Sequence, residues 1–217
     1  MRDYDYIKIR NEVRKKVEET CHSRNNKFKS SVWQYHIIPV VNHSLKLGKK
    51  FKADLEVLEL AALLHDYAGL KNKNFYKNHH LHSVRLADKI LTNFSFPKSK
   101  IAQVKQCINS HRGSVRIKPK TLEAKIIASA DAMAHITNLA DMFYLSFGVH
   151  QYETKKGAVW LKNKLQRSWS KIMPEGRKMI KEDYRIAMKI LNKAEKACSS
   201  DVPQSESWSA DSSFAGH

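Results

Sequence analysis

The doublet His65-Asp66 is the feature of this sequence that most directly points to chemistry. It ends an almost uninterrupted apolar run over residues 58–64, so two side chains that can bind a metal stand where a helix core stops. A carboxylate beside such a core is costly unless a cation or hydrogen-bond donors compensate its charge. An imidazole and a carboxylate together are a common ligand pair for divalent ions. The doublet therefore predicts a metal site at the end of this helix.

His36 is the candidate ligand upstream of the doublet. It shares a predicted helix face with Trp33 and Val40, where a lone histidine is more often a packed core group than a ligand. His43, seven residues later on roughly the same face, is its rival. The assignment of His36 as a metal ligand is favoured because further candidate ligands follow the doublet in a suitable order.

Asp131 is the candidate ligand downstream, on a predicted helix face that it shares with Ile127 and Ala134. A carboxylate on such an apolar stripe needs a partner, which could be a metal ion, a neighbouring helix end or a buried arginine. The residues around it are small and leave room for an ion: Ala128, Ser129, Ala130, Ala132 and Ala134. His135 and Asp141 continue the same helix but are predicted to point elsewhere, as residues behind the ligands or at the surface.

Three more histidines lie between the doublet and Asp131. His111 ends a predicted helix, where it can reach into a cleft, and Arg112 beside it could meet a phosphate. His79 and His80 open another predicted helix. Each could be a further ligand, a substrate contact or simply a polar residue at a helix start, and spacing alone does not separate the two.

The elements that must position these side chains are predicted to be helices. Apolar residues recur at helical spacing along nearly the whole chain, and alternating β-branched segments are absent. Asp54 suits the N-cap of the helix that ends at the doublet, and residues 119–121 suit the start of the helix that carries Asp131. Residues 159–172 and 175–197 are predicted to form two more helices. The fold class is therefore all-α, a helical bundle.

A polar segment over residues 67–78 directly follows the doublet and is predicted to be a loop. Loops beside a rigid site often carry substrate contacts. This segment holds Lys71, Lys73 and Lys77, which are candidates for contacts with an anionic substrate.

The composition predicts one domain and a tail. With 217 residues, of which 42% are hydrophobic, the chain has material for one core, assigned to residues 1–198 with a motif core at about 31–140. Residues 199–217 are rich in serine, which predicts a flexible polar tail. No stretch approaches the roughly 18 apolar residues that cross a bilayer, and no signal segment is visible, so we expect a cytoplasmic protein without a membrane partner. Cys21, Cys107 and Cys198 lack CxxC spacing, which predicts ordinary reduced thiols.

The charge balance favours anionic partners. The chain carries 39 Lys and Arg against 21 Asp and Glu, a formal net charge of +18. A solubilising surface is the plainest interpretation, because the basic residues are spread along the chain. Phosphorylated substrates come next, and nucleic acid is the weaker possibility because no known nucleic-acid motif or basic tract is present.

Several enzyme classes lack their motifs in this sequence. It has no GxxxxGK[ST] loop, no GxGxxG turn and no HxE with PCxxC, and only 7 glycines in all. Nucleotide-driven motors, dinucleotide oxidoreductases and zinc deaminases are therefore disfavoured.

The ordered set of His, His-Asp and Asp resembles the HD-domain metal-dependent phosphohydrolase family. The resemblance rests on five segments: residues 33–41, residues 58–66, His79-His80 with Ser83 and Ala87, residues 110–114, and residues 119–132. One departure is Tyr67-Ala68-Gly69, which stands where an Ile-Gly type of sequence often follows the doublet. Membership of the branch that acts on cyclic dinucleotides is not supported, because its further motifs are absent.

The resemblance implies an HD-domain-like all-α bundle in which His36, His65, Asp66 and Asp131 bind one divalent ion. Some family members hold two ions, and His79 or His80 together with His111 would fill the additional places here. The sequence does not distinguish Mn, Co, Mg, Fe, Ni or Zn.

The reaction that follows is hydrolysis of a phosphoester or phosphoanhydride by a metal-activated water. A bound ion lowers the pKa of its water towards ~7 and polarises a phosphoryl oxygen. Asp66 is the candidate both for ligation and for orienting or deprotonating that water. The candidate phosphate-binding cations are Lys71, Lys73, Arg112, Lys118 and Lys120.

The predicted substrate is a nucleotide or another small phosphorylated metabolite, and its identity and the oligomeric state are left open. The alternative function is a non-catalytic regulatory module that binds a metal or nucleotide and recruits partners through its basic surface. The two are distinguished by phosphate release, which the module would lack.

Overall fold

The computed structural model describes residues 4–112 and 117–197, and every regular element in this part of the chain is helical. This confirms the all-α prediction. The predicted tail over residues 199–217 lies outside the described residues, and the domain boundary at residue 198 stays a prediction.

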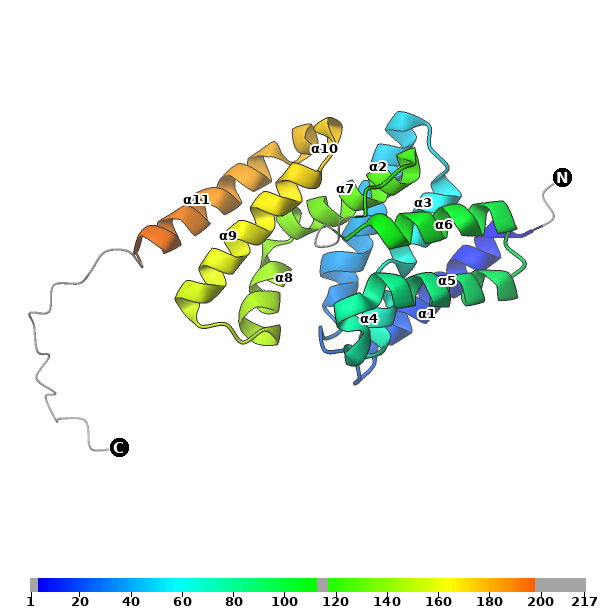
Figure 1. Ribbon diagram of the computed structural model, residues 1–217, viewed down its shortest axis with the longest axis horizontal. Helices are drawn as coiled ribbons and strands as arrows, with labels where there is room; N and C mark the ends of the chain where they lie inside the picture. Colours follow the sequence, from blue (N-terminus) through cyan, green and yellow to red (C-terminus); the bar gives the residue numbers. More distant parts are fainter. Residues whose placement is uncertain (1–3, 113–116, 198–217) are drawn as a thin grey trace, which may run out of the picture.

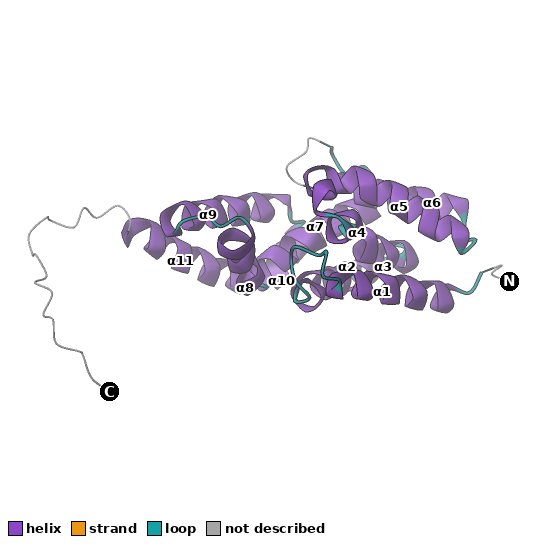
Figure 2. Cartoon of the chain, turned by 90° about the horizontal axis from the view of Figure 1, so that it is seen from below, coloured by secondary structure: helices purple, strands orange, loops and turns teal. Residues whose placement is uncertain are grey.

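The helices form two groups that share the helix α7 (Leu122–Thr137) (Figure 1). The first group contains α1 (Tyr6–His22), η1 (Trp33–Ile37), α2 (Ile38–Phe51), α3 (Leu55–Leu64), α4 (Tyr67–Lys71), η2 (Lys73–Asn78), α5 (His79–Asn93) and α6 (Lys98–Ser110). The second contains α8 (Leu139–Phe143), η3 (Tyr144–Val149), α9 (Thr154–Lys171), α10 (Pro174–Met179) and α11 (Lys181–Ala197). Figure 2 shows α9 and α11 side by side at the end of the molecule opposite the N-terminus.

The helix α3 forms the centre of the first group. It packs against α1, α2, α6 and α7, and Leu58, Leu60 and Leu63 on it are fully buried. Burying each such leucine contributes roughly 1.5–3 kcal/mol. Gly48 lets α2 approach α3 closely, because a Cβ there would lie 2.4 Å from a methyl carbon of Leu58. The helix that ends at the doublet is thus fixed in place by packing against four other helices.

Two predicted helix starts are confirmed by side-chain caps. The carboxylate of Asp54 accepts hydrogen bonds from the N–H groups of Glu56 at 3.0 Å and Val57 at 3.2 Å, at the start of α3. The hydroxyl of Thr121 accepts one from the N–H of Ala124 at 3.2 Å, at the start of α7. These caps set where the two helices that carry the doublet and Asp131 begin.

The loop predicted for residues 67–78 is wrong, because the chain forms α4 and the 3₁₀ helix η2 there. Asn72 separates the two and caps η2 by accepting a hydrogen bond from the N–H of Asn74 at 2.9 Å. The predicted helix at 159–172 is longer than expected, since α9 begins at Thr154. Cys21 and Cys107 are free and buried, as predicted for reduced thiols.

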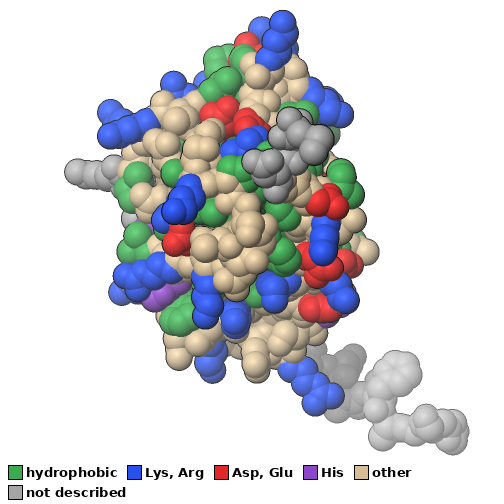
Figure 3. All heavy atoms as spheres, turned by 90° about the vertical axis from the view of Figure 1, so that its right-hand side faces the viewer, with side chains coloured by type: hydrophobic (Ala, Val, Ile, Leu, Met, Phe, Trp, Pro, Cys, Tyr) green, Lys and Arg blue, Asp and Glu red, His purple; other side chains and the backbone are tan. Residues whose placement is uncertain are grey.

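Basic side chains are spread over the surface, as they are spread along the sequence. On the face drawn in Figure 3, Lys and Arg side chains are scattered, with Asp and Glu between them. Within the described ranges, no helix combines the length and the apolar character that crossing a membrane requires.

Candidate metal centre

His36 lies in a turn that is wider than an α-helical turn. In η1 the N–H of Ile38 donates to the carbonyl of Trp33, five residues earlier. Pro39 follows at the start of α2 and has no N–H, so it cannot make the α-helical bond to Tyr35. Wide turns of this kind inside helices are frequent at functional sites. The turn directs the buried side chain of His36 towards the doublet.

The doublet occupies the break between α3 and α4. His65 ends α3 in helical conformation, and Asp66 leaves it with φ −106° and ψ 2°. The hydroxyl of Ser83 on α5 accepts a hydrogen bond from the N–H of Ala68 at 3.1 Å, which ties the first turn of α4 to α5. Gly69 permits this close approach, because a Cβ there would lie 3.3 Å from His79. The break therefore presents Asp66 at a fixed place.

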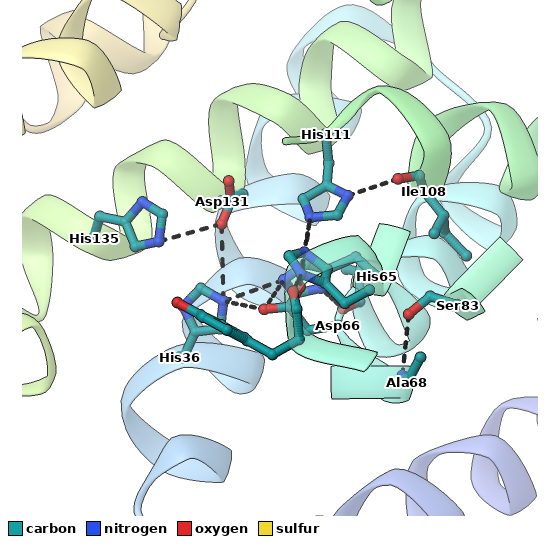
Figure 4. Close-up of polar contacts among 12 residues, drawn as sticks. His36, His65, Asp66, Ala68, Ser83, Ile108, His111, Asp131 and His135 are labelled. Carbon is teal, nitrogen blue, oxygen red and sulfur yellow. Dashed lines mark hydrogen bonds and ion pairs between the residues drawn. The ribbon is translucent and has the colours of Figure 1, made fainter. Parts of the chain in front are cut away.

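The candidate ligands from five helical elements meet at one point (Figure 4). The Nε2 atoms of His36 and His65 lie 3.1 Å apart, and each lies 3.4 Å from Oδ2 of Asp66. The Nε2 atom of His79 lies 3.0 Å from Oδ1 of Asp66, and that of His111 lies 3.5 Å from the same oxygen. The two oxygens of Asp66 thus face two different pairs of histidines.

Backbone carbonyls fix the orientation of three of these rings. Each Nδ1 lies within hydrogen-bond distance of the carbonyl three residues earlier: His65 of Ala62 at 2.7 Å, His79 of Tyr76 at 2.8 Å, and His111 of Ile108 at 2.6 Å. A carbonyl only accepts, so each Nδ1 carries the proton and donates it. The neutral ring then directs the lone pair of Nε2 into the site, which is the arrangement that metal-binding histidines use.

This arrangement fits a divalent cation. Lone pairs of Nε2 atoms and carboxylate oxygens converge, and such acceptors repel one another unless a cation or protons lie between them. The buried atom Oδ1 of Asp66 has no hydrogen-bond partner within the described structure. Two sets of residues offer ligand atoms within 4.8 Å of one another, namely His36, His65 and Asp131, and His65, Asp66 and His111. Nitrogen and carboxylate oxygen together suit Mn, Fe, Co, Ni and Zn.

Protonation of the histidines follows the same electrostatics. Burial would lower the pKa of His65, but the charge of Asp66 overcomes this and raises the pKa to about 9. Burial would likewise raise the pKa of Asp66, and the charges of His65 and His79 hold it well below its usual range. Protons therefore balance the carboxylate when no ion is bound, and an ion that binds must displace them.

Asp131 has its own cation on the side away from the doublet. Its Oδ1 lies 3.8 Å from Nε2 of His36, and its Oδ2 accepts a hydrogen bond from Nζ of Lys171 on α9 at 2.8 Å. Burial would raise the pKa of Asp131, but Lys171 and then His135 hold it well below its usual range. The buried arginine considered as an alternative partner is thus a lysine, which the sequence did not single out.

His135 and Asp141 were predicted to point elsewhere, as residues behind the ligands or at the surface, and for His135 the predicted direction is wrong. The Nε2 atom of His135 lies 3.5 Å from Oδ1 of Asp131, and its ring is stacked on His36 with centroids 5.4 Å apart. Asp141 lines the same cavity. His135 stands four residues after Asp131 on the continuous helix α7, so the two share a helix face, whereas Asp141 belongs to the separate short helix α8.

A cavity of about 350 Å³ opens over the candidate centre. The first group of helices supplies the candidate ligands on one wall, and α8, η3 and α9 supply the other. Three cations of α9 line it: Lys164, Arg167 and Lys171. Their spacing of three and four residues places them on one helix face. That spacing was readable in the sequence, but a charged stripe on a helix ordinarily indicates a solvated surface.

The lysines that the sequence favoured lie elsewhere. Lys71, Lys73, Lys118 and Lys120 are exposed and are not among the residues that line the cavity. The helical turns of α4 and η2 direct the first two to solvent. Arg112 does line the cavity, and its guanidinium donates to the carbonyl of Lys77.

The structure shows which of the candidate histidines face the site, a question that their spacing in the sequence left open. His79 faces Asp66, whereas His80 is buried outside the cavity, and its Nδ1 has no hydrogen-bond partner in the described ranges. His43 lies within hydrogen-bond distance of the hydroxyl of Thr137, at 3.2 Å, and does not line the cavity.

The fold and the site together define an all-α protein with a histidine and aspartate cluster suited to divalent metal ions. Residues 33–136 match the family model of the HD domain, so the chain contains an HD domain over this segment. HD domains bind divalent metals, so the match supports a metal-dependent hydrolase. A comparison with curated proteins finds no match.

Three solved structures are similar along most of their length. Lin1889 from Listeria innocua has a TM-score of 0.67 at 20% identity, with 90% of this chain and 98% of that chain covered. YpgQ from Bacillus subtilis in complex with ADP has a TM-score of 0.66 at 20% identity, covering 90% and 98%. A predicted HD superfamily hydrolase from an uncultured Thermotogales bacterium has a TM-score of 0.59 at 21% identity, covering 87% and 92%. At these identities the similarity concerns the fold.

Proposed function

We propose that this protein is a metal-dependent phosphohydrolase that cleaves a phosphoester or phosphoanhydride of a nucleotide or another small phosphorylated metabolite. The observation that carries the proposal is the placement of two kinds of residue in one cavity. The candidate metal ligands other than the fully buried His65 line this cavity, and so do Lys164 and Arg167 of α9. A phosphoryl group between them would meet positive charge on both sides. The ADP bound to Bacillus subtilis YpgQ supports a nucleotide as the substrate class.

The residues would divide the work as follows. His36, His65, Asp66 and Asp131 would hold one ion, and His79 and His111 would hold a second with the other oxygen of Asp66. A divalent ion supplies an activated water near neutral pH and polarises a phosphoryl oxygen. Asp66 would also orient that water and accept its proton. Lys164 and Arg167 would bind phosphoryl oxygens and stabilise the charge that develops on them.

Removing the metal tests the proposal directly. After treatment with EDTA the protein should release no phosphate or diphosphate from a panel of nucleotides and phosphomonoesters. Addition of Mn, Co, Mg, Fe, Ni or Zn, one at a time, should restore release with at least one ion. Elemental analysis of untagged protein should find bound metal. Metal binding without release from any substrate would instead support a non-catalytic binding module, and undiminished release in EDTA would contradict the metal assignment.

The affinity of the cavity for a phosphate anion should depend on pH through Lys164. Burial lowers the pKa of Lys164 to about 8, with contributions in the same direction from Lys171 and Arg167, while Asp131 and Asp66 oppose it. Lys164 is charged below this pKa, so affinity for a phosphate anion should fall as the pH rises through about 8. Loss of one charge-assisted contact weakens binding by about tenfold.

The measurement is calorimetric titration of metal-free protein with inorganic tripolyphosphate across this pH range. Lys164→Arg is the matched control, because a guanidinium stays charged throughout. The variant should bind with little change from low to high pH. An equal decline in both proteins would show that Lys164 is not the titrating contact.

A further inference from the structure

Among the aromatic residues that line the cavity of the candidate metal centre, four form a cluster. They are Tyr76, His150, Tyr152 and Trp160, and we refer to them as the aromatic end. Their ring centroids form a connected cluster: His150 to Tyr152 at 5.2 Å, His150 to Trp160 at 5.2 Å, Tyr152 to Trp160 at 5.8 Å, and Tyr76 to His150 at 6.3 Å. The rings come from η2, from the segment after η3 and from α9, so the tertiary fold assembles them.

The aromatic end has no part in the hydrolysis proposed above. Its rings are half-buried at the wall of a cavity instead of being sealed in the core. Phosphate recognition needs charge and hydrogen-bond donors, which Lys164 and Arg167 supply. Aromatic faces and edges at a cavity wall bind flat apolar groups, and nucleobases stack on such rings.

Helix α9 connects the aromatic end with the candidate metal centre. Lys171, the last residue of this helix, donates to Asp131, whereas Trp160 belongs to the aromatic end. The two residues are eleven positions apart, which corresponds to a rise of ~16 Å along an α-helix. Lys164 and Arg167 lie between these two points and line the same cavity. One helix face thus runs from the metal ligands past two cations to the aromatic rings.

The two intermediate cations are available for an anion. Within residues 4–112 and 117–197, Lys164 and Arg167 make no ion pair, whereas Lys171 pairs with Asp131 and Lys162 pairs with Glu195. A cavity that places two unpaired cations between a candidate metal centre and aromatic rings suits a molecule with a flat base at one end and a chain of phosphates at the other.

We propose that the aromatic end is a nucleobase-stacking subsite and that Lys164 and Arg167 bind the phosphate chain between it and the candidate metal centre. The substrate class would then be a nucleoside diphosphate or triphosphate, because two cations, Lys164 and Arg167, line the cavity between Trp160 and the candidate metal centre and each would bind a phosphoryl group. This inference rests on the proposed function for the identity of the reacting end only. Stacking of the base on Trp160 and its neighbours would make the protein prefer a nucleotide over a phosphate chain without a base.

The test compares a nucleotide with the same phosphates lacking a base. Metal-free protein in EDTA is titrated calorimetrically with ATP and with inorganic tripolyphosphate, so that no hydrolysis interferes. Wild type should bind ATP more tightly than tripolyphosphate. Trp160→Leu should weaken ATP binding by about tenfold and leave tripolyphosphate unchanged, because loss of base stacking has this magnitude. Trp160→Phe keeps a ring and should retain most of the ATP affinity.

A matched control is available on the same helix. Trp169 is stacked on Tyr184 with centroids 4.2 Å apart and does not line the cavity. Trp169→Leu should leave both affinities unchanged. Lys164→Ala or Arg167→Ala should weaken ATP and tripolyphosphate alike, since both probes carry the phosphates. Should Trp160→Leu lose its helical circular dichroism, Tyr76→Leu makes the same comparison from the opposite wall.

Some outcomes overturn the subsite and leave the proposed function standing. Equal ATP affinity in wild type and Trp160→Leu would do so, as would an equal loss for both probes in a folded variant. Metal-dependent hydrolysis could still be present in either case. Conversely, Trp160-dependent ATP binding without release of phosphate under any metal would support the subsite and overturn the hydrolase proposal.

Discussion

Asp66→Ala should remove bound metal from both halves of the candidate centre and lower phosphate release by at least about 10³-fold. The reason lies in the position of this side chain. One of its oxygens lies 3.4 Å from Nε2 of His36 and of His65, and the other lies 3.0 Å from Nε2 of His79. Among the candidate ligands it is therefore the group that faces both pairs of histidines. Its loss would remove the negative charge that faces both pairs of histidines as well as the candidate proton acceptor.

The measurement combines elemental analysis with the phosphate-release assay. Asp66→Asn keeps the shape and one oxygen but has no charge, so it should lose most activity and part of the metal. His43→Ala is the control, because it removes another half-buried histidine that lies outside the cavity. It should keep both metal and activity. An Asp66→Ala protein with full metal content and turnover would refute the assignment of Asp66.

Lys171→Met should destabilise the metal-free protein by about 2 kcal/mol near neutral pH and much less once metal is bound. Nζ of Lys171 donates to Asp131 at 2.8 Å and to the carbonyl of His111 at 2.7 Å. Without the lysine, a carboxylate that is only 8% exposed keeps its charge with weaker compensation. A divalent ion would supply the missing positive charge, so addition of metal should restore most of the stability.

The stability difference between wild type and Lys171→Met should depend on pH in a direction that follows from the pKa of Asp131. The pKa of Asp131 is depressed, first of all by Lys171 against the opposing effect of burial. The stability gained from this pair is therefore present above the ordinary pKa of an aspartate and lost as the pH falls below it. Removing Lys171 raises the pKa of Asp131, so the variant takes up a proton at higher pH than wild type. The stability difference between the two proteins should narrow as the solution is acidified.

Urea unfolding in EDTA and with added metal measures both effects. Lys162→Met is the matched control on the same helix, where Lys162 pairs with the more exposed Glu195. Loss of that pair should cost at most about 1 kcal/mol and should not respond to metal. Equal destabilisation of Lys171→Met with and without metal would show that Lys171 acts only through helix packing.

The sequence by itself determined the helices and most of the candidate ligands. Helical periodicity and the caps at Asp54 and Thr121 are local properties, so the boundaries of α3 and α7 could be predicted from neighbouring residues. The doublet and Asp131 were recognisable because polar groups on apolar faces need compensation wherever they stand. The order of these residues along the chain was sufficient to indicate the family.

Only the tertiary structure decided which groups share the cavity. The choice of His79 over His80, and the recruitment of Lys164, Arg167 and Lys171, depend on how helices cross. The lysines that sequence proximity favoured are exposed, whereas cations some hundred residues after the doublet line the site. Periodicity assigns a side chain to a face of its own helix, but the neighbour of that face is set by packing between segments distant in sequence. Most of the candidate metal ligands could therefore be predicted from the sequence, whereas the residues of α8, η3 and α9 that line the cavity could not.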